Sequence, residues 1–118
     1  MSHLLIILSI LFTTSVYANK ANILKVKSIC TEYKSCTFFV TVKHKDTGWK
    51  HFANKYEILT LDRKIIATRI LHHPHVDEQP FTRSISNVKI PKNIKTVIIR
   101  AHDLVHGYGG KEVIVEIQ

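Results

Sequence analysis

The sequence predicts an all-β fold, an immunoglobulin-like antiparallel β-sandwich of about seven strands. Three observations support this prediction. Short runs in which apolar and polar side chains alternate recur along the chain, as they do in half-buried strands. Turn-forming residues separate these runs, and no run shows the spacing of an amphipathic helix. About 100 residues follow the N-terminal apolar segment, which is enough for one such domain.

The predicted strands are residues 23–31, 37–44, 56–61, 64–71, about 82–90, 96–103 and 112–117. The second strand is the clearest, because Phe38, Val40 and Val42 alternate with polar residues. Only Asp62 and Arg63 separate the third strand from the fourth, which predicts a tight hairpin. A proline-containing turn precedes the sixth strand, which alternates as clearly as the second.

The N-terminus has the pattern of an export signal. Residues 4–12 form an apolar run too short to cross a bilayer as a helix, and small residues follow it at Val16 and Ala18. We therefore expect a signal peptide at 1–18 and one immunoglobulin-like domain at 19–118. An uncleaved anchor is the alternative, because no lysine or arginine precedes the run. After cleavage no transmembrane segment would remain, and the domain would be periplasmic or secreted at the bacterial envelope.

The two cysteines fit an exported protein. Cys30 and Cys36 flank a polar segment between two predicted strands, so a disulfide between them would close a hairpin. Such a short loop contributes about 2 kcal/mol on the chain-entropy estimate. The alternative, a pair of thiol metal ligands, is weaker because the spacing is longer than the CxxC of zinc and redox sites.

The formal net charge of +8 belongs to the predicted mature domain, because the signal segment contains no lysine or arginine. In an exported protein this charge favours anionic lipid, an anionic glycan or an acidic envelope protein over nucleic acid as a partner. The aromatic and basic spacing of nucleic-acid modules is missing. The charges are spread along the chain, so a solvated basic surface is the simpler interpretation.

Seven of the eight histidines form three groups, and each group is placed where a predicted strand gives way to a loop. The groups are His44 with His51, then His72, His73 and His75, then His102 with His106. In an immunoglobulin-like sandwich the connections after the second, fourth and sixth strands emerge at the same end. Neutral imidazole is the commonest metal ligand in proteins, so we expect a transition-metal site there, for iron, copper or zinc. The candidate ligands are His44, His51, His72, His73, His75, Asp103 and His106.

Alternation along the strands orients some of these side chains. The apolar face of the second strand continues to His44, and that of the sixth continues to Asp103. Both side chains are therefore expected at the end of the core. His102 lies on the opposite face and is expected to point away.

Further side chains near these loops could line a ligand pocket: Trp49, Asp77, Glu78, Arg83 and Tyr108. For the long connection at residues 72–80 the alternative is structural: Asp77 or Glu78 would pair with Arg83 and hold the connection in place. Phe52 and Tyr56 are expected to plug the end of the sandwich.

Three segments carry a resemblance to a group of small exported bacterial proteins without an assigned function: GWKHFANKYEIL, ILHHPHVDEQPFTRS and RAHDLVHGYGGKEV. The similarity covers nearly all of the predicted mature chain. It implies the bacterial envelope as the location and implies no activity.

A second, more distant resemblance is carried by His44, by His51 and by the DLVHG segment at 103–107. These positions resemble the iron site of superoxide reductases and desulfoferrodoxins, an immunoglobulin-like family in which histidines and one cysteine bind a mononuclear iron. On that pattern His44, His51 and His106 would be ligands. Asp103 stands where the family has cysteine, which removes the thiolate that tunes the iron. The resemblance therefore supports a metal site without carrying over the reaction.

The sequence thus leads to three functional hypotheses. The first is an exported domain that binds a transition metal. The second is a non-catalytic interaction module that binds an envelope protein or an anionic glycan through its basic surface and histidine-rich loops. The third is an iron redox enzyme similar to superoxide reductase. No arrangement typical of a Ser-His-Asp or Cys-His nucleophile is visible, so binding is favoured over catalysis.

Overall fold

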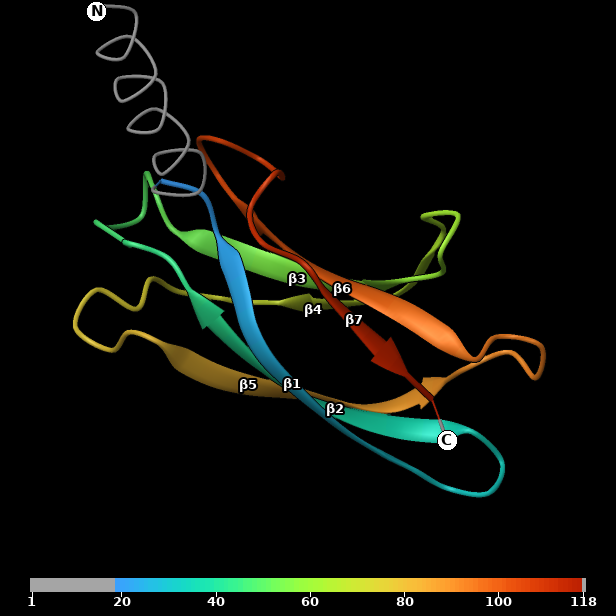
Figure 1. Ribbon diagram of the computed structural model, residues 1–118. Coiled ribbons are helices and arrows are strands. Elements are labelled where there is room, and N and C mark those ends of the chain that lie inside the picture. The colour runs from blue at the N-terminus through green and yellow to red at the C-terminus, as the bar shows by residue number, and fades with distance from the viewer. Residues whose placement is uncertain (1–18, 118) are drawn as a thin grey trace, which may run out of the picture.

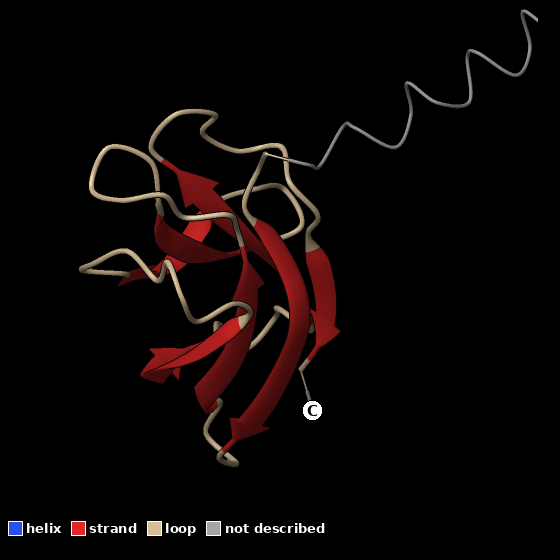
Figure 2. Ribbon diagram, turned by 90° about the vertical axis from the view of Figure 1, so that its left-hand side faces the viewer, coloured by secondary structure: helices blue, strands red, loops and turns tan. Residues whose placement is uncertain are grey.

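The computed structural model describes residues 19–117 (Figure 1). Within this range the chain forms seven strands and no helix (Figure 2). The strands are β1 (Asn22–Cys30), β2 (Ser35–Lys43), β3 (Ala53–Leu59), β4 (Ile65–Ile70), β5 (Phe81–Lys89), β6 (Thr96–Asp103) and β7 (Val113–Glu116). One antiparallel sheet has the order β1-β2-β5 and the other β4-β3-β6-β7. The predicted all-β, immunoglobulin-like sandwich is confirmed.

The core lies between the inner faces of the two sheets. In β2, Phe38, Val40 and Val42 are fully buried, as their alternation with polar residues requires. They pack in the same hydrophobic cluster as Val97 and Ile99 of β6. Both central strands run toward the same end of the sandwich, so the residue after β2 and the last residue of β6 come to lie at the end of this core.

β3 begins at Ala53 rather than at Tyr56, where the sequence pattern placed it. Ala53 pairs with Asp103 of β6, and this pairing extends the strand through Asn54 and Lys55. The polar side chains of these two residues hide the alternation on which the prediction depended. The earlier start of β3 matters for the site, because it shortens the β2–β3 loop and draws this loop toward the end of β6.

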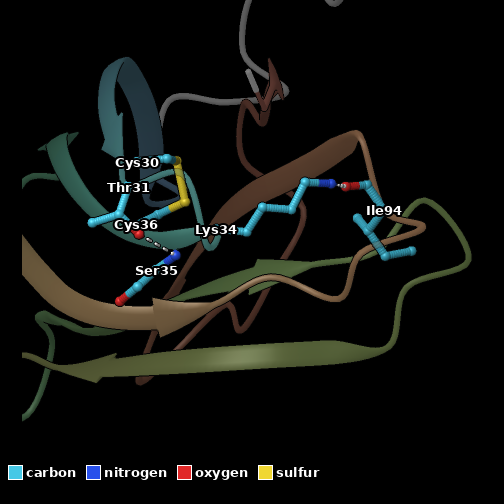
Figure 3. Close-up of a disulfide and its surroundings, with 6 residues drawn as sticks. All are labelled: Cys30, Thr31, Lys34, Ser35, Cys36 and Ile94. Atoms are coloured by element: carbon cyan, nitrogen blue, oxygen red, sulfur yellow. Dashed lines mark hydrogen bonds between the residues drawn. A yellow bond between two sulfur atoms is a disulfide. The ribbon is translucent and has the colours of Figure 1, made fainter.

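The disulfide between Cys30 and Cys36 joins the end of β1 to the start of β2, with a Cα–Cα distance of 4.0 Å (Figure 3). This confirms the predicted bridge, and no free cysteine is present. Within the same turn, the backbone N–H of Ser35 donates to Thr31 Oγ1 at 3.2 Å. Lys34 Nζ donates to the carbonyl of Ile94 at 2.9 Å, which ties this hairpin to the β5–β6 connection (Figure 3).

The β1–β2 turn lies at one end of the sandwich, and the β2–β3, β4–β5 and β6–β7 connections lie at the other (Figure 1). Backbone hydrogen bonds join the β6–β7 connection to the β2–β3 connection and the β4–β5 connection to β3. The N–H of Leu104 donates to the carbonyl of Phe52 at 3.2 Å, and that of Leu71 donates to the carbonyl of Asn54 at 2.8 Å.

Two sequence predictions concern the signal peptide and membrane spans. The signal peptide at 1–18 and its cleavage after Ala18 lie outside the described residues. Among the residues that are described, none belongs to a helix of the length and apolar character that a membrane span requires.

Candidate metal centre

Three side chains converge at the loop-bearing end of the core: His44 just after β2, His51 in the β2–β3 loop and Asp103 at the end of β6. We call them the His–Asp cluster. The side chains of His44 and Asp103 are buried, at 1% and 0% exposed, whereas that of His51 is 23% exposed. The cluster therefore has a closed inner side and a partly open side at His51.

The atoms that face one another in the His–Asp cluster are all potential metal ligands. His44 Nε2 lies 3.3 Å from Asp103 Oδ2, and His51 Nε2 lies 3.7 Å from Asp103 Oδ1. One ligand atom from each residue can be chosen so that all three lie within 4.8 Å of one another. Two atoms bound at about 2.0–2.1 Å to one tetrahedral ion would lie roughly 3.3–3.4 Å apart. The spacing in the cluster is close to what a shared cation needs.

These facing atoms are also without hydrogen bonds. Among residues 19–117, no partner satisfies His44 Nε2, His51 Nε2 or Asp103 Oδ2, although all three atoms are buried. Buried polar atoms are nearly always hydrogen-bonded, because leaving one unpaired costs about 1–3 kcal/mol. Three such atoms directed at one small region indicate a species that would bridge them, and a cation bound by two imidazoles and a carboxylate would do so.

Asp46 fixes the orientation of His44. Its Oδ1 accepts a hydrogen bond from His44 Nδ1 at 2.6 Å and one from the backbone N–H of Ala53 at 3.0 Å. Its Oδ2 accepts from the backbone N–H of His75 at 2.8 Å. An ionised carboxylate can only accept, so the Nδ1 of His44 carries the proton and neutral His44 has its free lone pair on Nε2. Carboxylates hold metal-binding histidines in this way in many metalloproteins.

Asp103 is held by the turn that follows it. Its Oδ1 accepts from the backbone N–H of Val105 at 2.9 Å and from that of His106 at 2.5 Å. Gly107 has a φ of 70° and exchanges backbone hydrogen bonds with Asp103, so the left-handed conformation that glycine allows closes the turn. These contacts leave Asp103 Oδ2 directed toward His44.

His106 lies beside the His–Asp cluster at its open side. Its Nδ1 is 3.4 Å from Asp103 Oδ1, and its ring centroid is 5.1 Å from that of His51. The side chain is 32% exposed. His106 is therefore a third imidazole adjacent to the cluster, on its partly exposed side.

The loop histidines do not join the cluster through their ring nitrogens. His75 is buried and stacks on Phe81 with a centroid distance of 3.9 Å. Its Nε2 accepts from Arg83 Nη2 at 3.0 Å, since a guanidinium only donates, and its Nδ1 lies 4.0 Å from Asp46 Oδ2. Burial, aided by Arg83 and His73, lowers the pKa of His75 and favours the neutral ring. His72 and His73 are exposed on the outside of the loop.

His102 lies on the other face of β6, as its position next to Asp103 requires. Its Nδ1 is 2.6 Å from Asn54 Oδ1, and its ring meets Tyr108 edge to face at 4.7 Å. Tyr108 also lies under the guanidinium of Arg100, 3.8 Å from the ring centroid. Tyr108 thus packs on the outer face of the sheet and lies away from the His–Asp cluster.

The other residues expected to line a pocket lie outside the cluster as well. Trp49 is 69% exposed and packs edge to face on Phe52. Asp77, Glu78 and Arg83 border a shallow surface cavity beside the β4–β5 loop. Glu78 accepts from Arg83 Nη2 at 3.2 Å, which is the structural ion pair that the sequence offered as an alternative.

Sequence reasoning missed two residues that build this site. Asp46 was not a candidate, although a carboxylate two positions after a strand-end histidine was the available signal. Gln79 was also passed over. Its Oε1 accepts from the backbone N–H of His44 at 3.0 Å, and its Nε2 donates to the carbonyl of His75 at 2.9 Å. Together they attach the β4–β5 loop to the end of β2.

The sequence is similar to a protein of Halomicrobium mukohataei that bears the name "Putative lipoprotein", with 31% identity over 106 residues. The aligned region makes up 90% of this chain and 52% of that protein, so the chain spans about half the length of its relative. No protein-family model matches the sequence, and no solved structure matches it. The resemblance to superoxide reductases accordingly gains no support from these comparisons.

Proposed function

We propose that this protein is an exported domain that binds a divalent transition metal through His44, His51 and Asp103, with His106 available as a further ligand. The observation that carries the proposal is the convergence of three buried, unpaired ligand atoms on one region. Two imidazoles and one carboxylate suit iron, copper and zinc, so the donor set leaves the choice among them to measurement.

The electrostatics of the site favour a cation over an empty cluster. Asp103 is fully buried, and neutral imidazoles bring no charge to balance an ionised carboxylate. A divalent ion would balance the charges and satisfy all three unpaired atoms. The competing arrangement is a protonated His44 held between Asp46 and Asp103, which would leave His51 Nε2 without a partner.

Export is supported by three independent features. Residues 1–18 have the pattern of a signal peptide, the described domain contains a disulfide, and the similar protein of Halomicrobium mukohataei bears the name "Putative lipoprotein". We propose a periplasmic or secreted location on this basis. Because Asp103 replaces the cysteine of the resembled iron family, we propose binding and not superoxide reduction.

The test is a metal titration of the purified, untagged protein by calorimetry, with a thermal-unfolding scan alongside. Iron(II), copper(II) and zinc(II) are each added after metal removal on a chelating resin. A bound ion stabilises the folded state by mass action, so at one hundred times Kd the unfolding free energy should rise by about 2.7 kcal/mol.

His51→Ala removes one ligand at the open side of the cluster, where loss of the side chain should leave the fold intact. We expect metal affinity to fall by at least about tenfold, because a divalent site of this kind depends on each ligand. His102→Ala is the matched control, since it alters a histidine on the outer face of the same sheet. Equal losses in both variants, or no binding of any of the three metals by the parent protein, would refute the proposal in favour of an interaction module.

A further inference from the structure

A cavity of about 700 Å³ opens beside β1 and the start of the β2–β3 loop. Four lysines line it: Lys20, Lys43, Lys45 and Lys111. Its volume is within the range of about 300–1,000 Å³ that is typical of small-molecule sites. The His–Asp cluster does not require this cavity, although His44 and Asp46 form part of its wall.

The positive charge of the cavity is only partly compensated. None of these four lysines forms an ion pair with a carboxylate within residues 19–117. Asp46 is the sole carboxylate among the lining residues of the described chain, and it already accepts hydrogen bonds from His44, Ala53 and His75. Four lysines against one buried carboxylate leave an excess of positive charge around this concave surface, which attracts an anion.

The cavity also has an apolar part. Leu24 of β1 and Val76 of the β4–β5 connection line it, and both are exposed, at 42% and 53%. Aliphatic side chains left open to solvent beside cationic groups suit a ligand that has an anionic head and an aliphatic portion.

We propose that this cavity binds an anionic amphiphile, a small molecule whose phosphate or carboxylate head contacts the lysines while its aliphatic chain covers Leu24 and Val76. The proposal does not depend on metal binding, because neither the lysines nor the two aliphatic residues belong to the His–Asp cluster.

The test compares three soluble probes by calorimetry and by two-dimensional NMR at low ionic strength: hexyl phosphate, inorganic phosphate and hexanol. The protein is first passed over a chelating resin, so that phosphate cannot bind through a metal. We expect hexyl phosphate to bind at least about tenfold more tightly than inorganic phosphate, the gain expected for burying about two methylene groups. Hexanol should bind more weakly than either phosphate.

Two variants separate the cavity from general surface charge. Lys20→Gln with Lys111→Gln should weaken hexyl phosphate binding by about tenfold, since two charge-assisted contacts are removed. Lys27→Gln with Lys89→Gln changes the net charge by the same amount. These two lysines are exposed on β1 and β5 and lie outside the cavity. This control pair should leave the affinity within about twofold.

Val76→Ser should weaken hexyl phosphate while leaving inorganic phosphate unchanged. Equal affinity for hexyl and inorganic phosphate would reduce the site to a simple anion site and overturn the proposal. Equal losses in both lysine pairs would overturn it as well.

A further arm uses vesicles of phosphatidylcholine with phosphatidylglycerol. Vesicle binding without any binding of hexyl phosphate would assign the lysines to a membrane surface instead.

Discussion

Asp46 connects more of the site than any other single residue. It orients His44, and it accepts backbone hydrogen bonds from the start of β3, at Ala53, and from the β4–β5 loop, at His75. Both of its oxygens are in use, so its carboxylate is a structural centre as well as the group that sets the tautomer of His44.

Asp46→Asn should therefore affect both stability and metal binding. An asparagine keeps one oxygen acceptor but places an N–H₂ group against an N–H donor, which leaves at least one buried donor unpaired. We expect the unfolding free energy of the metal-free protein to drop by about 1–3 kcal/mol, measured by urea denaturation. Metal affinity should fall by about 10–100-fold in a calorimetric titration.

Asp77→Asn is the control for Asp46→Asn, because Asp77 is exposed on the β4–β5 loop. It should change the unfolding free energy by no more than about 0.5 kcal/mol. If Asp46→Asn behaved like Asp77→Asn in both measurements, the positioning role of Asp46 would be wrong.

At the scale of the elements, the two ends of the sandwich are built by different means. The β1–β2 end is closed by a disulfide, and the other end is closed by loops that meet at Asp46 and Asp103. The strands between them separate the two ends, so changes at one end should not reach the other.

Replacing Cys30 and Cys36 together by alanine tests this separation. Loss of the short cross-link should lower the unfolding free energy by about 2 kcal/mol, and calorimetry should show a lower Tm. Removal of the buried Cys36 sulfur adds a small packing loss. Metal affinity should remain within about twofold of the parent value, because the His–Asp cluster lies at the far end. A large loss of metal affinity in a variant that still folds would contradict the separation.

For the whole molecule, buried neutral histidine makes stability depend on pH. Burial lowers the pKa of His75, with the charges of Arg83 and His73 acting in the same direction. When the pKa of a histidine is lower in the folded chain than in the unfolded chain, protons bind preferentially to the unfolded chain. The unfolding free energy is therefore highest above the unfolded pKa of about 6.5, and it decreases as the pH falls from there toward the folded pKa.

We therefore expect the unfolding free energy of the metal-free protein to decrease as the pH is lowered below about 6.5. His75→Gln should reduce the slope of that decrease, because it removes a group that the unfolded chain protonates more readily. Chemical denaturation at a series of pH values measures the slope. His72→Gln, at an exposed position on the same loop, should leave the slope unchanged. A steeper slope in His75→Gln would reverse the assigned sign.

Local patterns in the sequence were sufficient for the fold. The alternation in β2 and β6, the turn at Asp62 and the spacing of the cysteines each depend on neighbouring residues, so they indicate the strands and the disulfide directly. The same alternation placed His44 and Asp103 on the inner faces, where both are buried. The expected order of the strands also predicted that the loops carrying the histidines would emerge at one end of the sandwich.

Tertiary structure decided which of those histidines point at one another. His72 and His73 share a loop with His75, but only His75 turns inward, and its Nε2 is occupied by Arg83. The role of Asp46 depends on backbone groups of Ala53 and His75, which only the folded chain brings within hydrogen-bonding distance. Loop side-chain directions depend on contacts between residues far apart in sequence, and no local period encodes them.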